Sequence, residues 1–120
     1  MMLAGYALAL ALMGTPAQGT AWRTFYGPFE GKQGIIGSRD NRLRPGDCAA
    51  NLLPYGTRVE IAGKVYTVRD CGAKSNDRIA RRKGASIWLD VFTRDRSKRL
   101  VSGLVKYRVL HRPARKGKHR

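Results

Sequence analysis

Histidine and cysteine are scarce in this sequence, which excludes several kinds of site. It has two histidines, His111 and His119, and two cysteines, Cys48 and Cys71. Their spacing matches no zinc-binding pattern, and a nucleophilic Cys–His pair is disfavoured because both histidines fall near the end of the chain. No glycine-rich phosphate-binding loop follows a predicted strand. We therefore expect no metal and no cofactor, and any reaction has to use carboxyl groups.

Acidic residues are also scarce. The chain has 8 Asp and Glu against 24 Lys and Arg, a formal net charge of +16, and every charge lies beyond residue 21. A protein with this charge is attracted to polyanions such as nucleic acid, anionic lipid or the anionic polymers of a bacterial envelope. Charge by itself does not distinguish these partners.

Long apolar runs are missing after residue 13. The run 3–13 is itself well short of the about 20 residues that span a membrane. Small residues follow it, so 1–21 is predicted to be a signal peptide, cleaved after Ala17 or Ala21, although no Lys or Arg precedes the run. The alternative is a buried N-terminal helix, which would have no polar face. We expect a secreted or periplasmic protein without a membrane span, which favours an envelope partner over nucleic acid.

Export also bears on the cysteines. In an oxidising compartment an even number of cysteines indicates disulfides, so Cys48 and Cys71 are predicted to be bonded to each other. In the chain-entropy model a loop of this length contributes about 3–4 kcal/mol. The alternative is two free buried thiols.

Turn residues divide the mature part, predicted as the domain 22–110, into short segments typical of strands. We predict five strands, at 22–26, 57–61, 65–69, 87–92 and 104–110. Residues 31–47 are predicted to be a loop beside the functional groove, 77–83 a short helix or a basic loop, and 111–120 a disordered basic tail. About five or six short strands favour an all-β fold, a small barrel.

Asp90 is the most unusual residue of the strand pattern because it interrupts the apolar run 87–92. In a strand it shares a face with Trp88 and Phe92, so aromatic rings would flank it. Desolvation raises the pKa of a carboxyl group and allows it to donate a proton near neutral pH. The alternative is a structural Asp paired with an arginine.

Asp70 ends the predicted strand 65–69 and is, by itself, typical of a turn. Its interest lies in a pairing with Asp90, because two carboxyl groups in one groove are the usual means of cleaving a glycosidic bond. Asp47 or Asp40, in the preceding loop, would add a third acid.

Three sequence blocks resemble, in content and order, the signature blocks of double-psi β-barrel cell-wall proteins. They are LPYGTRV at 53–59, VRDCG at 68–72 and WLDVF at 88–92. The related groups are the three-aspartate domain of the lytic transglycosylase A type and the rare lipoprotein A and expansin-like barrels, and TFYGP at 24–28 is similar to the opening strand of the rare lipoprotein A group. The family has a short glycine-rich link where residues 71–86 form a basic insertion.

The resemblance implies a six-stranded double-psi barrel with a sugar-binding groove in which Asp90 is the catalytic acid. Asp90 would protonate the glycosidic oxygen after N-acetylmuramic acid and then take the proton of that sugar's 6-hydroxyl, giving a 1,6-anhydro product. Asp70 would support the charge that develops on the sugar. Four further residues are expected to contact the glycan: Tyr26, Asp47, Arg69 and Trp88.

The leading hypothesis is therefore a secreted, monomeric peptidoglycan lytic transglycosylase. The first alternative is a barrel of the expansin or rare lipoprotein A type that binds wall polysaccharide without catalysis. The second is a basic nucleic-acid-binding protein that keeps its N-terminus.

Overall fold

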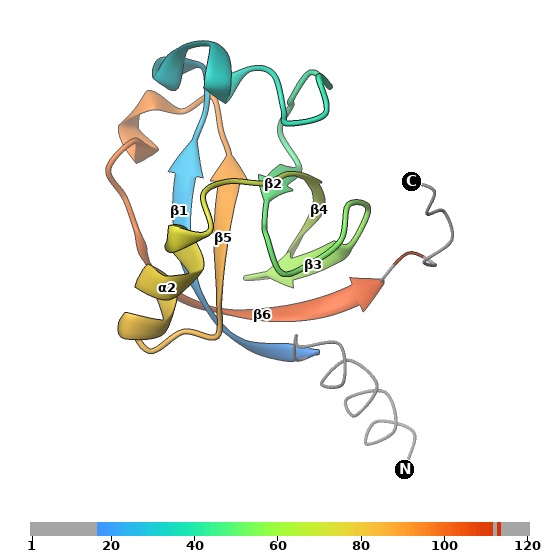
Figure 1. The fold of residues 1–120 in the computed structure, drawn as a ribbon, viewed down its shortest axis with the longest axis vertical. Coiled ribbons are helices and arrows are strands. Elements are labelled where there is room, and N and C mark those ends of the chain that lie inside the picture. Colours follow the sequence, from blue (N-terminus) through green and yellow to red (C-terminus); the bar gives the residue numbers. More distant parts are fainter. Residues whose placement is uncertain (1–16, 112, 114–120) are drawn as a thin grey trace.

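Six strands close into a barrel in the computed structural model, which describes residues 17–111 and 113 (Figure 1). They are β1 (Gln18–Tyr26), β2 (Asp47–Ala49), β3 (Arg58–Ile61), β4 (Lys64–Asp70), β5 (Ile87–Phe92) and β6 (Gly103–His111). Around the ring the order is β1-β5-β2-β4-β3-β6, with β1–β5 and β2–β4 parallel and the other neighbours antiparallel. The predicted small all-β barrel is confirmed.

Short helical segments cover the outside of this barrel. Two are 3-10 helices, η1 (Pro28–Gly34) and η2 (Arg96–Lys98), and the third is an α-helix, α2 (Ser75–Arg82). The helical alternative for 77–83 is therefore correct, and α2 lies against β5 (Figure 1). None of the described helices is both long and apolar enough to cross a membrane.

β5 divides its side chains between two apolar clusters, which explains its nearly continuous apolar sequence. Ile87, Leu89 and Val91 are buried in the barrel interior. Trp88 and Phe92 alternate with them and lie on the outer face, in a second cluster that includes Ala80 of α2 and Tyr26 of β1. The predicted shared face of Trp88, Asp90 and Phe92 is thus an outer face covered by a helix and loops.

β3 and β4, which match the strands predicted at 57–61 and 65–69 to within one residue at each end, form a hairpin. The chain reverses at Ala62 and Gly63, whose φ angles of 52° and 80° are both positive, as a tight two-residue hairpin turn requires. The first residues of the predicted loop 31–47 belong to the end of η1, and its last residue, Asp47, begins the short strand β2, which the sequence pattern did not indicate.

The predicted disulfide between Cys48 and Cys71 is wrong, since both cysteines are free. Cys48 lies in register with Val68 of β4 and is buried in the barrel interior. Cys71 comes after the end of β4 and is exposed. The strand register therefore places Val68, and not Cys71, beside Cys48.

β1 begins at Gln18, four residues before the predicted strand and inside the predicted signal peptide. Gln18–Ala21 pair with Arg108–Val105 of β6, and Ala21 is fully buried opposite Ile87. The rest of the predicted signal peptide, residues 1–16, lies outside the described residues, as do 112 and 114–120 of the predicted tail. Those two assignments stay predictions.

The extent of β1 predicts the stability of shortened chains. A protein that starts at Trp22 loses four β6-paired residues, whereas one that starts at Gln18 keeps them. With about 1 kcal/mol net for each backbone hydrogen bond lost, the shorter chain should be less stable by about 3 kcal/mol or more. Urea denaturation of both proteins measures this difference. Equal free energies of unfolding would contradict the role of Gln18–Ala21.

Thiol alkylation tests the free cysteines. In the folded protein, isolated without reductant, iodoacetamide should modify Cys71 alone, because Cys48 is buried and burial raises the pKa of its thiol. After unfolding in denaturant both thiols should react. Intact-mass measurement distinguishes the two products, and a chain that takes up no label even when unfolded would show that the cysteines are bonded.

Candidate functional site

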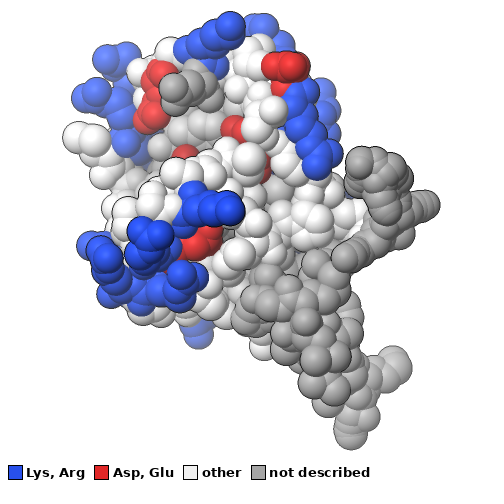
Figure 2. Space-filling view, viewed as in Figure 1, with Lys and Arg blue, Asp and Glu red and all other residues white. Residues whose placement is uncertain are grey.

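A groove of about 370 Å³ opens on the outer face of the barrel. Four of the residues predicted from sequence line it: Tyr26 of β1, Asp70 of β4, and Trp88 and Asp90 of β5. Figure 2 shows acidic side chains within the hollow on this face, with Lys and Arg around its rim. The two carboxyl groups predicted to act together therefore border one space.

The register of three strands brings these carboxyl groups together. Ala49 of β2 pairs with Asp90 of β5 on one side and with Asp70 of β4 on the other. Since neighbouring strands are about 4.8 Å apart, the two aspartates are separated by about 10 Å at their Cα atoms. The small Ala49 side chain lies between them and also lines the groove.

A register shift in β4 directs Asp70 toward the groove. Val68 pairs with Cys48 and faces the barrel interior. Regular alternation would turn Asp70 inward as well, because it lies two residues further along. The ladder shifts at Arg69, so that the next residue of β2, Ala49, pairs with Asp70. Bulges of this kind redirect side chains next to functional sites.

Asp90 is held by neutral hydrogen-bond partners. Thr24, its register partner on β1, donates from Oγ1 to Asp90 Oδ1 over 2.8 Å. Trp88 Nε1 in turn donates to Thr24 Oγ1 over 3.1 Å, which fixes the hydroxyl. Within the described part of the chain no Lys or Arg forms an ion pair with Asp90, so the arginine-paired alternative is not what the structure contains.

The surroundings of Asp90 favour its protonated form. Burial raises the pKa of this carboxyl group to about 7, and the negative charges of Glu30 and Asp70 act in the same direction. The hydrogen bond from Thr24 opposes the shift, because it stabilises the carboxylate. At neutral pH a large fraction of Asp90 therefore carries a proton beside an open groove, as a general acid must.

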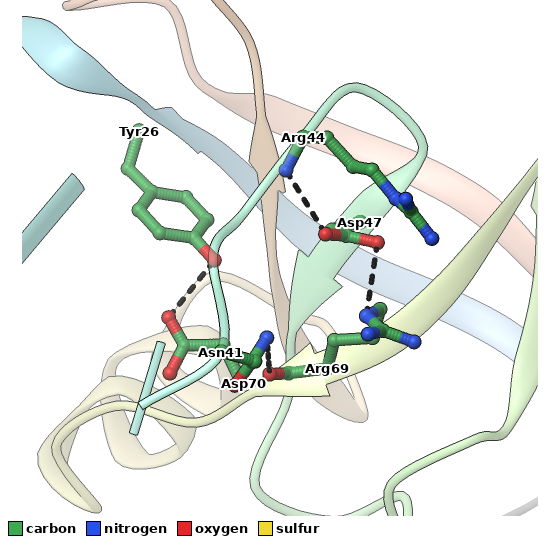
Figure 3. A network of polar contacts seen from close by, with 6 residues as sticks. All are labelled: Tyr26, Asn41, Arg44, Asp47, Arg69 and Asp70. Atoms are coloured by element: carbon green, nitrogen blue, oxygen red, sulfur yellow. Dashed lines mark hydrogen bonds and ion pairs between the residues drawn. The ribbon is translucent and has the colours of Figure 1, made fainter. Parts of the chain in front are cut away.

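Asp70 is held firmly from three sides. It accepts a hydrogen bond from Tyr26 Oη at 2.9 Å (Figure 3). The backbone N–H groups of Ser38 and Cys71 also donate to it, over 2.8 Å and 2.9 Å. Burial and the neighbouring Asp70 charge both raise the pKa of Tyr26, so this hydroxyl stays protonated and donates. The arrangement gives Asp70 a fixed orientation at the wall of the groove.

Asp47 and Arg69, two other predicted contacts, lie outside this groove. Asp47 accepts a hydrogen bond from the Arg44 backbone N–H at 3.0 Å and forms an ion pair with Arg69 Nε at 3.5 Å. Figure 3 shows this pair apart from the contact between Tyr26 and Asp70. Both residues border a separate hollow with Arg44 and Arg58, so the structure does not bring Asp47 into the groove as a third acid.

Several residues that hold the groove together were missed from the sequence. Asp77 of α2 is buried and accepts hydrogen bonds from the Trp88 backbone N–H at 3.2 Å and from Asn51 Nδ2 at 2.9 Å. Asn51 Oδ1 accepts from the Gly72 backbone N–H at 3.0 Å. A Cβ at Gly72 would lie 2.6 Å from the Trp88 ring, so only glycine allows this close packing.

The described residues form no candidate metal site, and the chain matches no known protein in three comparisons. Among residues 17–111 and 113 no group of three or more His, Cys, Asp and Glu side chains is arranged to hold a metal ion. Comparisons of the chain with protein-family models, with curated proteins and with solved structures gave no match. The geometry of the groove is therefore the basis for assigning a function.

The pKa of Asp90 predicts how stability depends on pH. In the unfolded chain this carboxyl group ionises near its ordinary pKa of 3.8, whereas in the folded protein it keeps its proton up to about 7. Between these values the folded state binds more protons, so the free energy of unfolding should fall as the pH rises and level off above 7. At 1.36 kcal/mol for each pKa unit, the loss is of the order of 4 kcal/mol.

Asp90→Asn isolates this contribution, because the amide has the same shape and does not titrate. Urea denaturation of both proteins between about pH 4 and pH 8 should show a downward slope for the wild type that the variant lacks. Parallel pH profiles for the two proteins would show that Asp90 ionises normally.

Proposed function

We propose that this protein is an exported peptidoglycan lytic transglycosylase in which Asp90 is the acid and base. The observation that carries the proposal is a sheltered carboxyl group with a pKa near 7 that lines an open groove beside a second carboxyl group. Perturbed acids in concave sites are candidates for catalysis, and a pair of carboxyl groups suits glycosidic bonds.

The reaction would run in two proton transfers through one carboxyl group. Protonated Asp90 donates to the glycosidic oxygen after N-acetylmuramic acid, and the bond from that sugar's C1 to the oxygen breaks. The resulting carboxylate then removes the proton of the 6-hydroxyl while O6 forms a bond to C1. Asp90 regains its proton, the product is a 1,6-anhydro sugar, and no water is consumed.

Asp70 would stabilise the positive charge that develops on the sugar and would not transfer a proton. The C1–O cleavage leaves positive charge on the sugar ring, which a nearby fixed carboxylate stabilises. Three hydrogen-bond donors fix the orientation of Asp70. Asp90 has a single donor, Thr24, among the described residues, and it binds Oδ1 only. The two acids thus have different surroundings and would have different roles.

We also propose that the barrel is of the double-psi type. A closed ring of six strands is the architecture that the family resemblance implies. Two of the three resembling blocks carry the two groove acids, since 68–72 covers the end of β4 and 88–92 lies in β5. These positions support a double-psi barrel related to cell-wall proteins.

The proposal includes export to the bacterial envelope, which the net charge of +16 suits. Of the two proposed cleavage positions, the one after Ala17 leaves β1 whole, because the strand begins at Gln18. Basic side chains gather over α2, within the basic insertion (Figure 2). Such a surface would attract the protein to anionic wall polymers without a separate binding domain.

Digestion of purified sacculi tests the proposal. The wild type should release anhydromuropeptides that mass spectrometry detects, and Asp90→Asn should release them at least about 100-fold more slowly, as for the loss of a general acid. The rate should fall as the pH rises above about 7, because Asp90 then loses its proton.

Asp95→Asn is the matched control, because it makes the same change at an exposed acid outside the groove and should leave the rate unchanged. If all three proteins bind sacculi and none releases product, the transglycosylase is excluded and the wall-binding alternative remains. Products without the anhydro ring would show that water attacks C1. Failure to bind sacculi would exclude both readings.

A further inference from the structure

Another hollow, which we call the barrel mouth, lies beside the interior core and measures about 660 Å³. Interior residues form part of its wall: Ile61 and Val91 belong to the core, and Phe25 and Tyr66 pack against it. None of its lining residues is shared with the groove that holds Asp90. Its size suits a small ligand, and the mouths of β-barrels are common binding places.

The barrel mouth is positively charged and apolar. Its charged lining residues are Arg23, Lys64 and Lys98, with no Asp or Glu among them. The ion pairs found among the described residues involve Arg69 and Arg108, so these three cations have no carboxylate within ion-pair distance in that part of the chain. Lys64 and Lys98 are exposed, whereas Arg23 is half-buried, and a charge that is partly removed from water is stabilised by an anionic partner.

Arg23 is the most unusual of the three. On β1 it alternates with Trp22 and Thr24 of the outer face, and it lies on the same side as buried Ala21 and as Phe25. Its Nε is buried and has no hydrogen-bond partner among the described residues. Buried donors are nearly always satisfied, and an arginine offers several in a plane that fits two oxygen atoms.

Two of these cations lie close to the ring of Phe25. The guanidinium carbon of Arg23 lies 4.6 Å from the centre of the Phe25 ring, and Lys98 Nζ lies 5.5 Å from it. Two cations therefore approach one ring at the edge of an apolar hollow. An anion would relieve their repulsion and supply the acceptor that Arg23 Nε lacks.

We propose that the barrel mouth binds a small oxyanion, a carboxylate or a phosphate monoester, that carries an apolar or ring-shaped body. The oxygen atoms pair with Arg23, with Lys98 and Lys64 at the rim, and the body packs against Phe25 and Tyr66. This site is separate from the groove of the proposed transglycosylase, so Asp90→Asn should bind the same ligand as tightly as the wild type.

Titration with phenyl phosphate, followed by NMR, tests the site. We expect a dissociation constant in the millimolar range or below, with shifts confined to the barrel mouth and to the side-chain Nε–H of Arg23. Phenol has the same ring without the anion and should not bind. Inorganic phosphate, which has no body to pack on Phe25, should bind more weakly.

Arg23→Gln should weaken phenyl phosphate binding by about tenfold or more, the usual cost of losing a charged hydrogen bond. The control Arg81→Gln, an equal change of charge at an exposed position of α2, should bind within about twofold of the wild type. If Arg23→Gln does not fold, Lys98→Gln at the exposed rim should weaken binding by about threefold or more.

Unchanged affinity in the folded Arg23→Gln or, failing that, in Lys98→Gln would overturn the proposal. So would shifts confined to α2, or no binding of phenyl phosphate at millimolar concentrations. Two more ligands distinguish the source of the oxyanion. N-acetylmuramic acid differs from N-acetylglucosamine by a carboxylate-bearing lactyl group, and preferential binding of the former would point to wall sugars. Equal failure of both sugars, with phenyl phosphate bound, would point to a phosphate ligand instead.

Discussion

The pairing of Ala49 with Asp90 on one side and with Asp70 on the other is the constraint on which the candidate site depends. It requires β2 to lie between β5 and β4, and it requires the shift at Arg69. Without that shift Asp70 would point into the interior core, where an unpaired carboxylate is costly. The side chain at position 49 also has to stay small, because it separates the two acids.

The outer apolar cluster gives Asp90 its properties. Trp88, Phe92 and Tyr26 form this cluster with α2, and they shelter a carboxyl group that a barrel surface would otherwise leave in water. The shelter disfavours the carboxylate form, so Asp90 contributes less to the stability of the folded protein at neutral pH than at acidic pH. Burying a carboxyl group in a strand lowers stability, and a feature of this kind inside a groove is typical of a functional site.

β1 contributes to two different surfaces by simple alternation. Thr24 and Tyr26 face the groove acids, whereas Arg23 and Phe25 face the barrel mouth. The same strand therefore supplies neutral hydrogen-bond donors to carboxyl groups on one side and, on the other, a cation that has no ion-pair partner among the described residues. In a protein with a net charge of +16, the groove is a local concentration of its few acids.

Local sequence patterns determined much of the secondary structure of this protein. The short apolar run 87–92 indicated a strand, and the alternation of side chains along any strand placed Trp88, Asp90 and Phe92 on one face. The turn residues between 57–61 and 65–69 separated the two strands of the β3–β4 hairpin. Residues far apart in the chain were decided only by the tertiary structure. Thr24 reaches Asp90 through a parallel pairing, Cys48 meets Val68 instead of Cys71, and Asp47 turns to Arg69. These outcomes follow from strand order and register, which arise from the closure of the whole barrel and leave no signal in any short segment.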